Sequence, residues 1–108
     1  AFSRATGLAP LPEAPRRRHV YNQFVITCPR REALQKRLKA ASVGTEVYYP
    51  VPFHRQKCFA DVPSSSSPFP VSDWAAESSL AIPIYSELTL PMRETVVARG
   101  SEILESED

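Results

Sequence analysis

The chain has 108 residues, of which 43% are hydrophobic, and its 13 basic and 12 acidic side chains leave a net charge of +1 at pH 7. This length suits a single domain or a piece of one, and the small net charge argues against nucleic acid or a membrane surface as a partner. The sequence has no apolar run of about 18 residues and no signal-peptide pattern at its start, so we expect a soluble, cytoplasmic protein.

The first 28 residues divide into a proline-interrupted stretch and a strand. Pro10, Pro12 and Pro15 interrupt residues 1–18, which show little periodicity, so we predict an extended lead-in that contributes no packed element. Residues 19–28, HVYNQFVITC, are rich in β-branched and aromatic side chains, and alternate side chains fall on opposite faces. This pattern predicts the best strand of the chain.

A helix is predicted to begin at Pro29, because proline suits a first helical turn. Leu34, Leu38 and Ala41 then fall at i, i+4 and i+7, a spacing that places them on one apolar face. Gly44 is predicted to end the helix as a left-handed cap.

The middle of the chain is predicted to hold a second strand and a long connector. Residues 45–49 form the strand, which ends at Pro50 and Pro52 because proline cannot donate to a β-ladder. Residues 63–70, PSSSSPFP, have the composition of a flexible surface loop.

Three further elements are predicted in the last third of the chain. A short helix capped by Ser72 or Asp73 runs through Ser79, and residues 80–84 form a short strand whose proline places it at an edge or an end. Thr89 caps a final helix. The apolar face of that helix is predicted to consist of Met92, Val96, Ile103 and Leu104.

The order of these elements predicts an α+β fold. Strands and helices alternate, but the turns contain too few glycines for a nucleotide-binding parallel sheet. We therefore predict a small three-stranded, largely antiparallel sheet with helices packed on one face. The other face of such a sheet must be covered by a partner or remain exposed to solvent.

Candidate binding residues concentrate in residues 44–56, GTEVYYPVPFHRQ. Tyr48 and Tyr49 point to opposite faces of a strand, so one can pack while the other donates a hydrogen bond to a phosphate or sugar oxygen. His54 and Gln56 follow a loop stiffened by two prolines, which lowers the entropy lost when polar side chains are held toward a ligand. The alternative is two ordinary β-forming tyrosines and a surface histidine.

A second candidate is Asn22, which lies in the polar run of residues 21–23 inside an otherwise apolar strand. Such a run suggests an edge that faces a cleft or an interface. The alternative is a solvated strand face.

Other features of the sequence favour no site. Residues 16–18 are three arginines that could form a nucleic-acid arm, but without interleaved aromatic residues a solvated linker is favoured. Cys28 and Cys58 have no CxxC spacing and no neighbouring histidine, so we expect unpaired thiols and no metal site.

Residues 44–56, together with HVYNQFVI before them and LAIPIYSELT after them, resemble the carboxy-terminal part of the DegT/DnrJ/StrS-type sugar-nucleotide aminotransferases. These are pyridoxal-phosphate (PLP) enzymes of the fold-type I class. Their pattern G-x-x-x-x-Y-P-x-P-x-H-x-Q is matched by Gly44, Tyr49, Pro50, Pro52, His54 and Gln56. Many relatives have histidine where this chain has Tyr48, and arginine where it has Thr27.

The resemblance implies that residues 1–18 link a large domain, absent from this sequence, to a small domain at residues 19–108. It implies a homodimeric parent that moves an amino group, usually from glutamate, to a keto-sugar linked to a nucleotide. The parent would use the cofactor as electron sink. The resemblance implies that Tyr48 and Tyr49 bind the substrate, and we predict that His54, Gln56 and Asn22 belong to the same substrate-binding set.

The cofactor machinery is not expected in this chain. PLP needs a lysine for its Schiff base, and Lys36, Lys39 and Lys57 fall on an exposed helix face or a loop. The resemblance places the cofactor lysine in the large domain, so we expect a fragment without catalytic residues that is inactive alone. The alternative is a free-standing, non-catalytic binding or interaction module.

Overall fold

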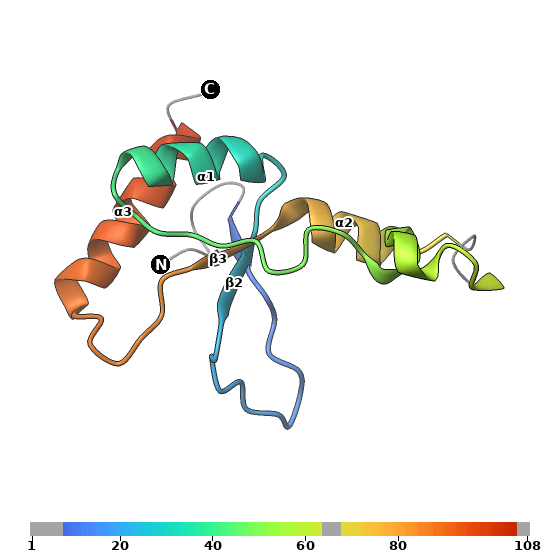
Figure 1. Ribbon diagram of the computed structural model, residues 1–108. Helices are drawn as coiled ribbons and strands as arrows, with labels where there is room; N and C mark the ends of the chain where they lie inside the picture. Colours follow the sequence, from blue (N-terminus) through green and yellow to red (C-terminus); the bar gives the residue numbers. More distant parts are fainter. Residues whose placement is uncertain (1–7, 64–67, 106–108) are drawn as a thin grey trace.

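The computed structural model describes residues 8–63 and 68–105, and its centre is a three-stranded antiparallel sheet (Figure 1). The strands lie in the order β1 (Ala9–Pro10), β2 (Phe24–Thr27) and β3 (Ser79–Ile82). Central strand β2 pairs with both neighbours, so that Thr27 lies opposite Ala9 on one side and Ser79 on the other. The predicted α+β fold with a small antiparallel sheet is confirmed.

The third strand is not the one that the sequence predicted. Residues 45–49 form a single bridge, between Glu46 and Ala81, with backbone N···O distances of 3.0 and 2.8 Å. Instead β1 comes from the lead-in, where Leu8 is buried at 4% exposure. The prediction that the lead-in contributes no packed element is therefore wrong at residues 8–10, because burial of Leu8 fixes the backbone beside β2.

Strand β2 is shorter than the predicted strand of residues 19–28. Tyr21 has φ 52°, in the left-handed region, so the chain cannot be extended there. The tyrosine ring stacks between His19 and Phe24, with ring centroids 4.3 and 5.4 Å away. This local stacking replaces strand pairing before residue 24.

Helix α1 (Arg31–Ala40) buries the apolar face that the sequence predicted. Leu34 and Leu38 are each only 1% exposed, whereas Ala41 lies beyond the helix and is exposed. Pro29 precedes the helix instead of lying in its first turn. The predicted periodicity is thus confirmed, and the predicted start is wrong by two residues.

The end of α1 is a Schellman motif centred on Ser42. Ser42 has φ 61°, the Val43 amide donates to the Leu38 carbonyl at 2.8 Å, and the Ser42 amide donates to the Lys39 carbonyl at 3.0 Å. Val43 and Leu38 are both buried in the core, which is the apolar contact that accompanies this motif. The prediction of a left-handed Gly44 is therefore wrong, because the chain turns two residues earlier.

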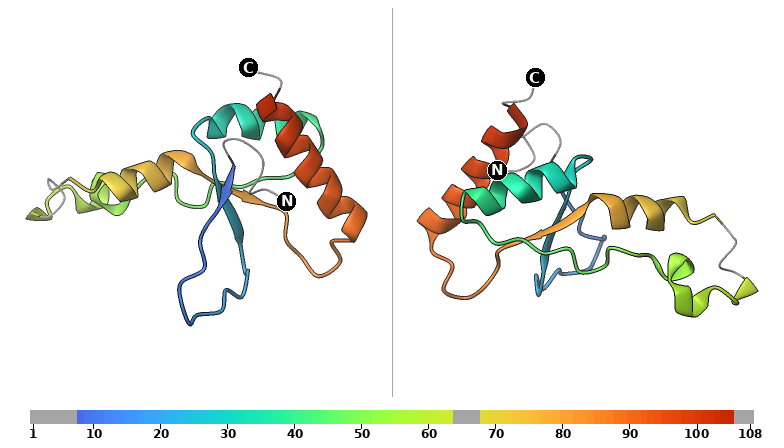
Figure 2. Two further views of the ribbon diagram at one scale, coloured as in Figure 1. Left: turned by 180° about the vertical axis from the view of Figure 1, so that it is seen from behind. Right: turned by 45° about the horizontal axis from the view of Figure 1, so that its top comes forward.

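Helices α1 and α3 (Leu90–Glu105) pack together on one side of the sheet (Figures 1 and 2). As predicted, Thr89 caps α3, and its Oγ1 accepts a hydrogen bond from the Met92 amide at 3.4 Å. Val96 packs against the core, whereas Met92 is exposed. The side chains of Ile103 and Leu104 lie outside the described ones. The core between helices and sheet consists of Leu8, Ile26, Cys28, Leu34, Leu38, Val43, Leu80 and Ile82.

Helix α2 (Pro70–Ser78) leaves the sheet and, with the 3₁₀ turns η2 (Phe53–Arg55) and η3 (Lys57–Phe59), forms a projection that we call the arm (Figure 1). It begins at Pro70 with Phe69 as its cap, three or four residues before the predicted cap. The Arg31 side chain donates to the Ala76 carbonyl and so ties the arm to α1. The four serines of the predicted connector, residues 64–67, lie outside the described residues.

Two further expectations concern the thiols and the membrane. Cys28 is a buried core residue and Cys58 is exposed, and both are free thiols, as predicted. Within residues 8–63 and 68–105, no helix is long and apolar enough to cross a membrane. Trp74 is 52% exposed on the arm.

The role of β1 predicts different outcomes for two nearby leucines. Leu8→Ala should lower the free energy of unfolding by about 2–5 kcal/mol, because it leaves a cavity in the core. Leu11→Ala is the matched control, since Leu11 is 47% exposed and its loss should cost less than about 1 kcal/mol. Urea denaturation of both variants measures this. Equal destabilisation would contradict the observed burial of Leu8.

Candidate functional site

Two neighbouring tyrosines line a groove of about 570 Å³ between the sheet, the segment after Glu46 and helix α2. Tyr48 is 50% exposed and Tyr49 is 77% exposed. We call this the tyrosine groove. Its lining includes Leu11, Gln23, Val25, Tyr48, Tyr49, Val51, Phe53, Gln56, Ser72 and Ala75.

Both tyrosines are exposed because the chain leaves the sheet before them. The bridge of Glu46 to Ala81 is the last pairing, and Pro50 and Pro52 have no N–H with which to continue a ladder. The expectation that one tyrosine packs while the other faces out is therefore wrong. Both phenol rings lie at the groove, where each hydroxyl can donate a hydrogen bond.

Gln56 lines the same groove, but both its side-chain amide and its backbone amide form hydrogen bonds within the loop. Its Nε2 donates to the Val51 carbonyl at 3.1 Å, and its Oε1 lies 3.8 Å from Cys58 Sγ. Within turn η2 the Gln56 amide donates to the Phe53 carbonyl at 3.0 Å. Gln56 thus fixes the conformation of the segment that carries the tyrosines.

His54 lies away from the groove lining and contacts helix α2. Its Nε2 is 2.9 Å from Asp73 Oδ1, its side chain is only 12% exposed, and its ring packs on Phe69 with centroids 4.9 Å apart. Arg55 Nε donates to the same Asp73 oxygen at 2.7 Å. One carboxylate therefore holds two consecutive residues of the loop against α2.

This cluster has electrostatic consequences for its members. The hydrogen bond from Arg55 lowers the pKa of Asp73 below its usual value, and Asp73 in turn raises the pKa of Arg55. Sequence reasoning proposed Asp73 only as a helix cap. Nothing in the sequence pairs it with residues 18 and 19 positions earlier across a serine-rich connector.

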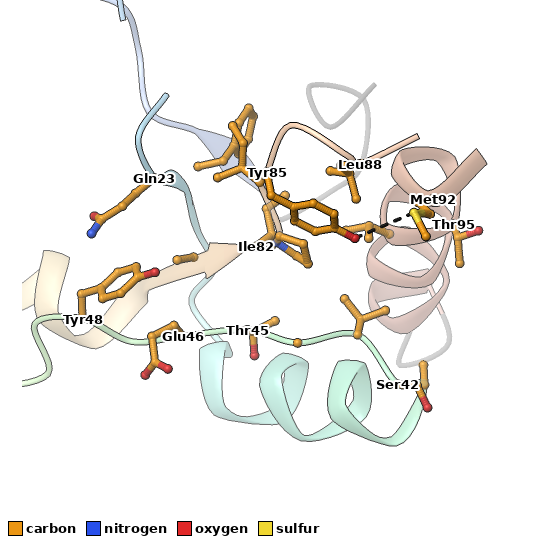
Figure 3. Close-up of a pocket in the computed structure, with 18 of the residues that line it drawn as sticks. Gln23, Ser42, Thr45, Glu46, Tyr48, Ile82, Tyr85, Leu88, Met92 and Thr95 are labelled. Atoms are coloured by element: carbon orange, nitrogen blue, oxygen red, sulfur yellow. Dashed lines mark hydrogen bonds between the residues drawn. The ribbon is translucent and has the colours of Figure 1, made fainter. Parts of the chain in front are cut away.

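A second groove, of about 650 Å³, lies on the other side of Tyr48 between the end of α1, β3 and α3 (Figure 3). Gln23, Glu46 and Tyr48 line both grooves, so the two meet at this tyrosine. Asn22 lines the second groove, and the Tyr85 hydroxyl lies 3.8 Å from Met92 Sδ on its far side. Sequence reasoning named Asn22 but missed Glu46, whose position beside the bridge only the fold reveals.

The structure therefore groups four of the five predicted site residues around Tyr48 and separates the fifth. Tyr48, Tyr49 and Gln56 share one groove, Asn22 and Tyr48 share the other, and His54 lines neither. Phenols, amides and one carboxylate can bind hydroxyl, amide and phosphate groups. The two linings, among the described residues, contain no lysine, and no three metal-ligating side chains gather there.

Comparison with known proteins identifies the group of proteins that this chain resembles. The model of the DegT/DnrJ/EryC1/StrS aminotransferase family matches residues 1–99. A Geobacillus stearothermophilus protein named "Pleiotropic regulatory protein" is 36% identical over 83% of this chain and 24% of its own length. The UDP-N-acetyl-3-dehydro-alpha-D-glucosamine 3-aminotransferase of Acidithiobacillus ferrooxidans is 37% identical over 87% of this chain and 24% of its own length.

A solved structure shares the fold of the whole chain. The crystal structure of Streptomyces venezuelae DesV in complex with a ketimine intermediate superposes with a TM-score of 0.91 at 26% identity, over 99% of this chain and 29% of DesV. The chain thus spans about a quarter of the length of the curated relatives that it matches.

The Asp73 cluster predicts a pH dependence of the arm. Because the folded pKa of Asp73 is depressed, its stabilising contact is complete above the unfolded pKa and is lost as the pH falls through the folded pKa. NMR titration of the Asp73 carboxyl should give a midpoint below the ordinary value, and Arg55→Gln should move that midpoint up. Arg99→Gln, which breaks an ion pair with Glu102 on α3, should leave it unchanged. A midpoint unaffected by Arg55→Gln would refute the assigned cause.

Proposed function

Because this chain belongs to the DegT/DnrJ/EryC1/StrS aminotransferase family, we propose that it forms the carboxy-terminal domain of a longer enzyme that transfers an amino group to a nucleotide-linked keto-sugar. The observation that carries this proposal is the family match over residues 1–99. The name of the Acidithiobacillus relative, an aminotransferase for a UDP-linked dehydro-sugar, supports this class of acceptor. We propose glutamate as the amino donor.

In this enzyme the present chain would form a wall of the substrate cleft. The exposed hydroxyls of Tyr48 and Tyr49 would donate to phosphate or sugar oxygens, and Asn22 would contribute from the adjoining groove. Gln56 would hold the loop and also present its amide to the groove. The low exposure of His54 favours a positioning role, in which it holds the tyrosine-bearing segment against α2.

The residues of this chain do not fit the anchoring of PLP, the cofactor of the aminotransferases. A covalent anchor needs a lysine in a cleft. Lys36 and Lys39 are exposed on α1 and Lys57 is exposed in η3, and none lines either groove of the described chain. PLP, which supplies the electron sink in transamination, would therefore be held by residues outside this chain.

Exposed apolar side chains on the arm support a dimeric parent. Phe53, Val71 and Trp74 are among the exposed large hydrophobic residues there. Large apolar side chains that stay exposed together on a projection are typical of a protein interface. We propose that the parent is a homodimer and that the arm takes part in its contact.

A second candidate function, a non-catalytic interaction module, draws on the name of one relative. The Geobacillus protein is called a pleiotropic regulatory protein. Such a module would bind nucleotide-sugars or a protein partner but would show no amino transfer in the full-length protein. Assay of the full-length protein for transamination of nucleotide-linked keto-sugars with glutamate separates the two.

Because neither groove is lined by a described lysine, we predict that this chain and its full-length parent differ in PLP binding. The 108-residue chain, mixed with PLP and passed through gel filtration, should retain no stoichiometric cofactor absorbance, because no described lysine lines a groove. The full-length protein, treated in the same way, should retain one cofactor per subunit. Stoichiometric retention by the short chain would contradict the assignment.

The substrate wall predicts a selective kinetic defect in the full-length protein. Tyr49→Phe removes only a hydroxyl, and loss of a hydrogen bond to a charged phosphate should lower kcat/KM for the nucleotide-sugar about 10-fold or more. The half-reaction with the amino donor should stay within about 2-fold. Arg99→Gln on α3 is the control, because Arg99 lines neither groove and pairs with Glu102. Equal loss in both half-reactions would assign Tyr49 to the fold.

A further inference from the structure

Residues 11–23 form a loop between β1 and β2 that carries three consecutive arginines, Arg16, Arg17 and Arg18. We call it the arginine loop. It extends from the sheet in the direction away from α1 and α3 (Figure 1). Among the described residues, none of the three guanidinium groups forms an ion pair. The carboxylate of Glu13, the one acidic residue of the loop, already accepts a hydrogen bond from the His19 amide.

Hydrogen bonds and ring stacking within the arginine loop fix the conformation of its backbone. Arg16 has φ 58°, and the Arg17 amide donates to the Ala14 carbonyl at 3.1 Å, which closes a turn around them. On the returning side, His19 Nδ1 accepts a hydrogen bond from the Tyr21 amide at 2.8 Å, and the two rings stack. Such preorganisation reduces the entropy lost when a ligand is bound.

The base of the arginine loop is also the rim of the tyrosine groove. Leu11, at one end of the loop, and Gln23, at the other, line that groove together with Tyr48 and Tyr49. The three arginines, which form no ion pair with the described residues, therefore lie in a loop whose two ends are at the edge of the surface that we assign to the substrate. The arginines are the cationic side chains of the loop that borders this groove. An elongated anionic ligand bound at the tyrosines can therefore extend toward them.

We propose that the arginine loop binds the diphosphate group of the nucleotide-sugar, an inference that rests on the proposed function. Each planar guanidinium can donate two parallel hydrogen bonds to phosphate oxygens, and charge-assisted bonds of this kind are the strong ones. A UDP-linked acceptor, as in the name of the Acidithiobacillus relative, carries a diphosphate. A charge-based contact of this kind holds the substrate while the tyrosine groove selects the groups beside it.

The test uses the full-length protein with the triple substitution Arg16→Gln, Arg17→Gln and Arg18→Gln. Calorimetric titration with UDP and dTDP should show affinity at least ~10-fold weaker than that of the unaltered protein, because charge-assisted bonds are lost. Affinity for uridine and thymidine, which lack phosphate, should not change. For the unaltered protein, affinity for the diphosphate should fall as salt rises, and the variant should lose most of this dependence.

A matched control removes three charges elsewhere. Lys36→Gln, Lys39→Gln and Arg99→Gln lie on the exposed surfaces of α1 and α3, and this triple variant should bind UDP and dTDP as the unaltered protein does. Unchanged nucleotide affinity in the arginine variant, or an equal loss in the control, would overturn the inference and leave the proposed function standing. If the unaltered protein binds neither UDP nor dTDP, both the inference and the proposed function fail.

Discussion

The pairing of β2 with β3 is the contact on which the rest of this structure depends. It joins two four-residue strands that are more than fifty positions apart, with Ile26 opposite Leu80 and both side chains buried in the core. Every functional segment starts at one of these strands. The arginine loop enters β2, helix α2 leads into β3, and the bridge of Glu46 to Ala81 holds the tyrosine segment on the free edge of β3.

Polar contacts hold the arm in place, whereas apolar burial holds the sheet and helices α1 and α3 together. Arg31 ties the end of α2 to α1 through the Ala76 carbonyl, and Asp73 ties the beginning of α2 to His54 and Arg55. Exposed ion pairs contribute little to global stability. They do fix direction, because two donors converge on one carboxylate oxygen. The polar contacts that hold the arm beside the tyrosine groove thus lie outside the apolar core.

The sequence predicted what depends on regular periodicity and missed what depends on single residues. The spacing of Leu34 and Leu38 predicts α1, because a helical face repeats every three or four positions. The short β1 contains a proline and has no alternation, so only the burial of Leu8 reveals it. Likewise, the left-handed conformation of Tyr21 ends a segment that reads as a strand. Family resemblance located the tyrosines, but the contact of His54 with Asp73 crosses a connector that no local pattern bridges.

The apolar side chains of this chain divide between a buried core and an exposed set on and near the arm. Its eight-residue core lies between the helices and the sheet, yet Phe53 and Val71 on the arm, and Tyr49 before it, are exposed. A domain that evolved to stand in water keeps such side chains scattered, whereas one that forms a cleft with another body gathers them on its projections. Of these, Phe53 and Tyr49 line the tyrosine groove, whose lining among the described residues contains no lysine. In the enzyme that we propose, this wall would bind the substrate while residues outside the chain hold the cofactor.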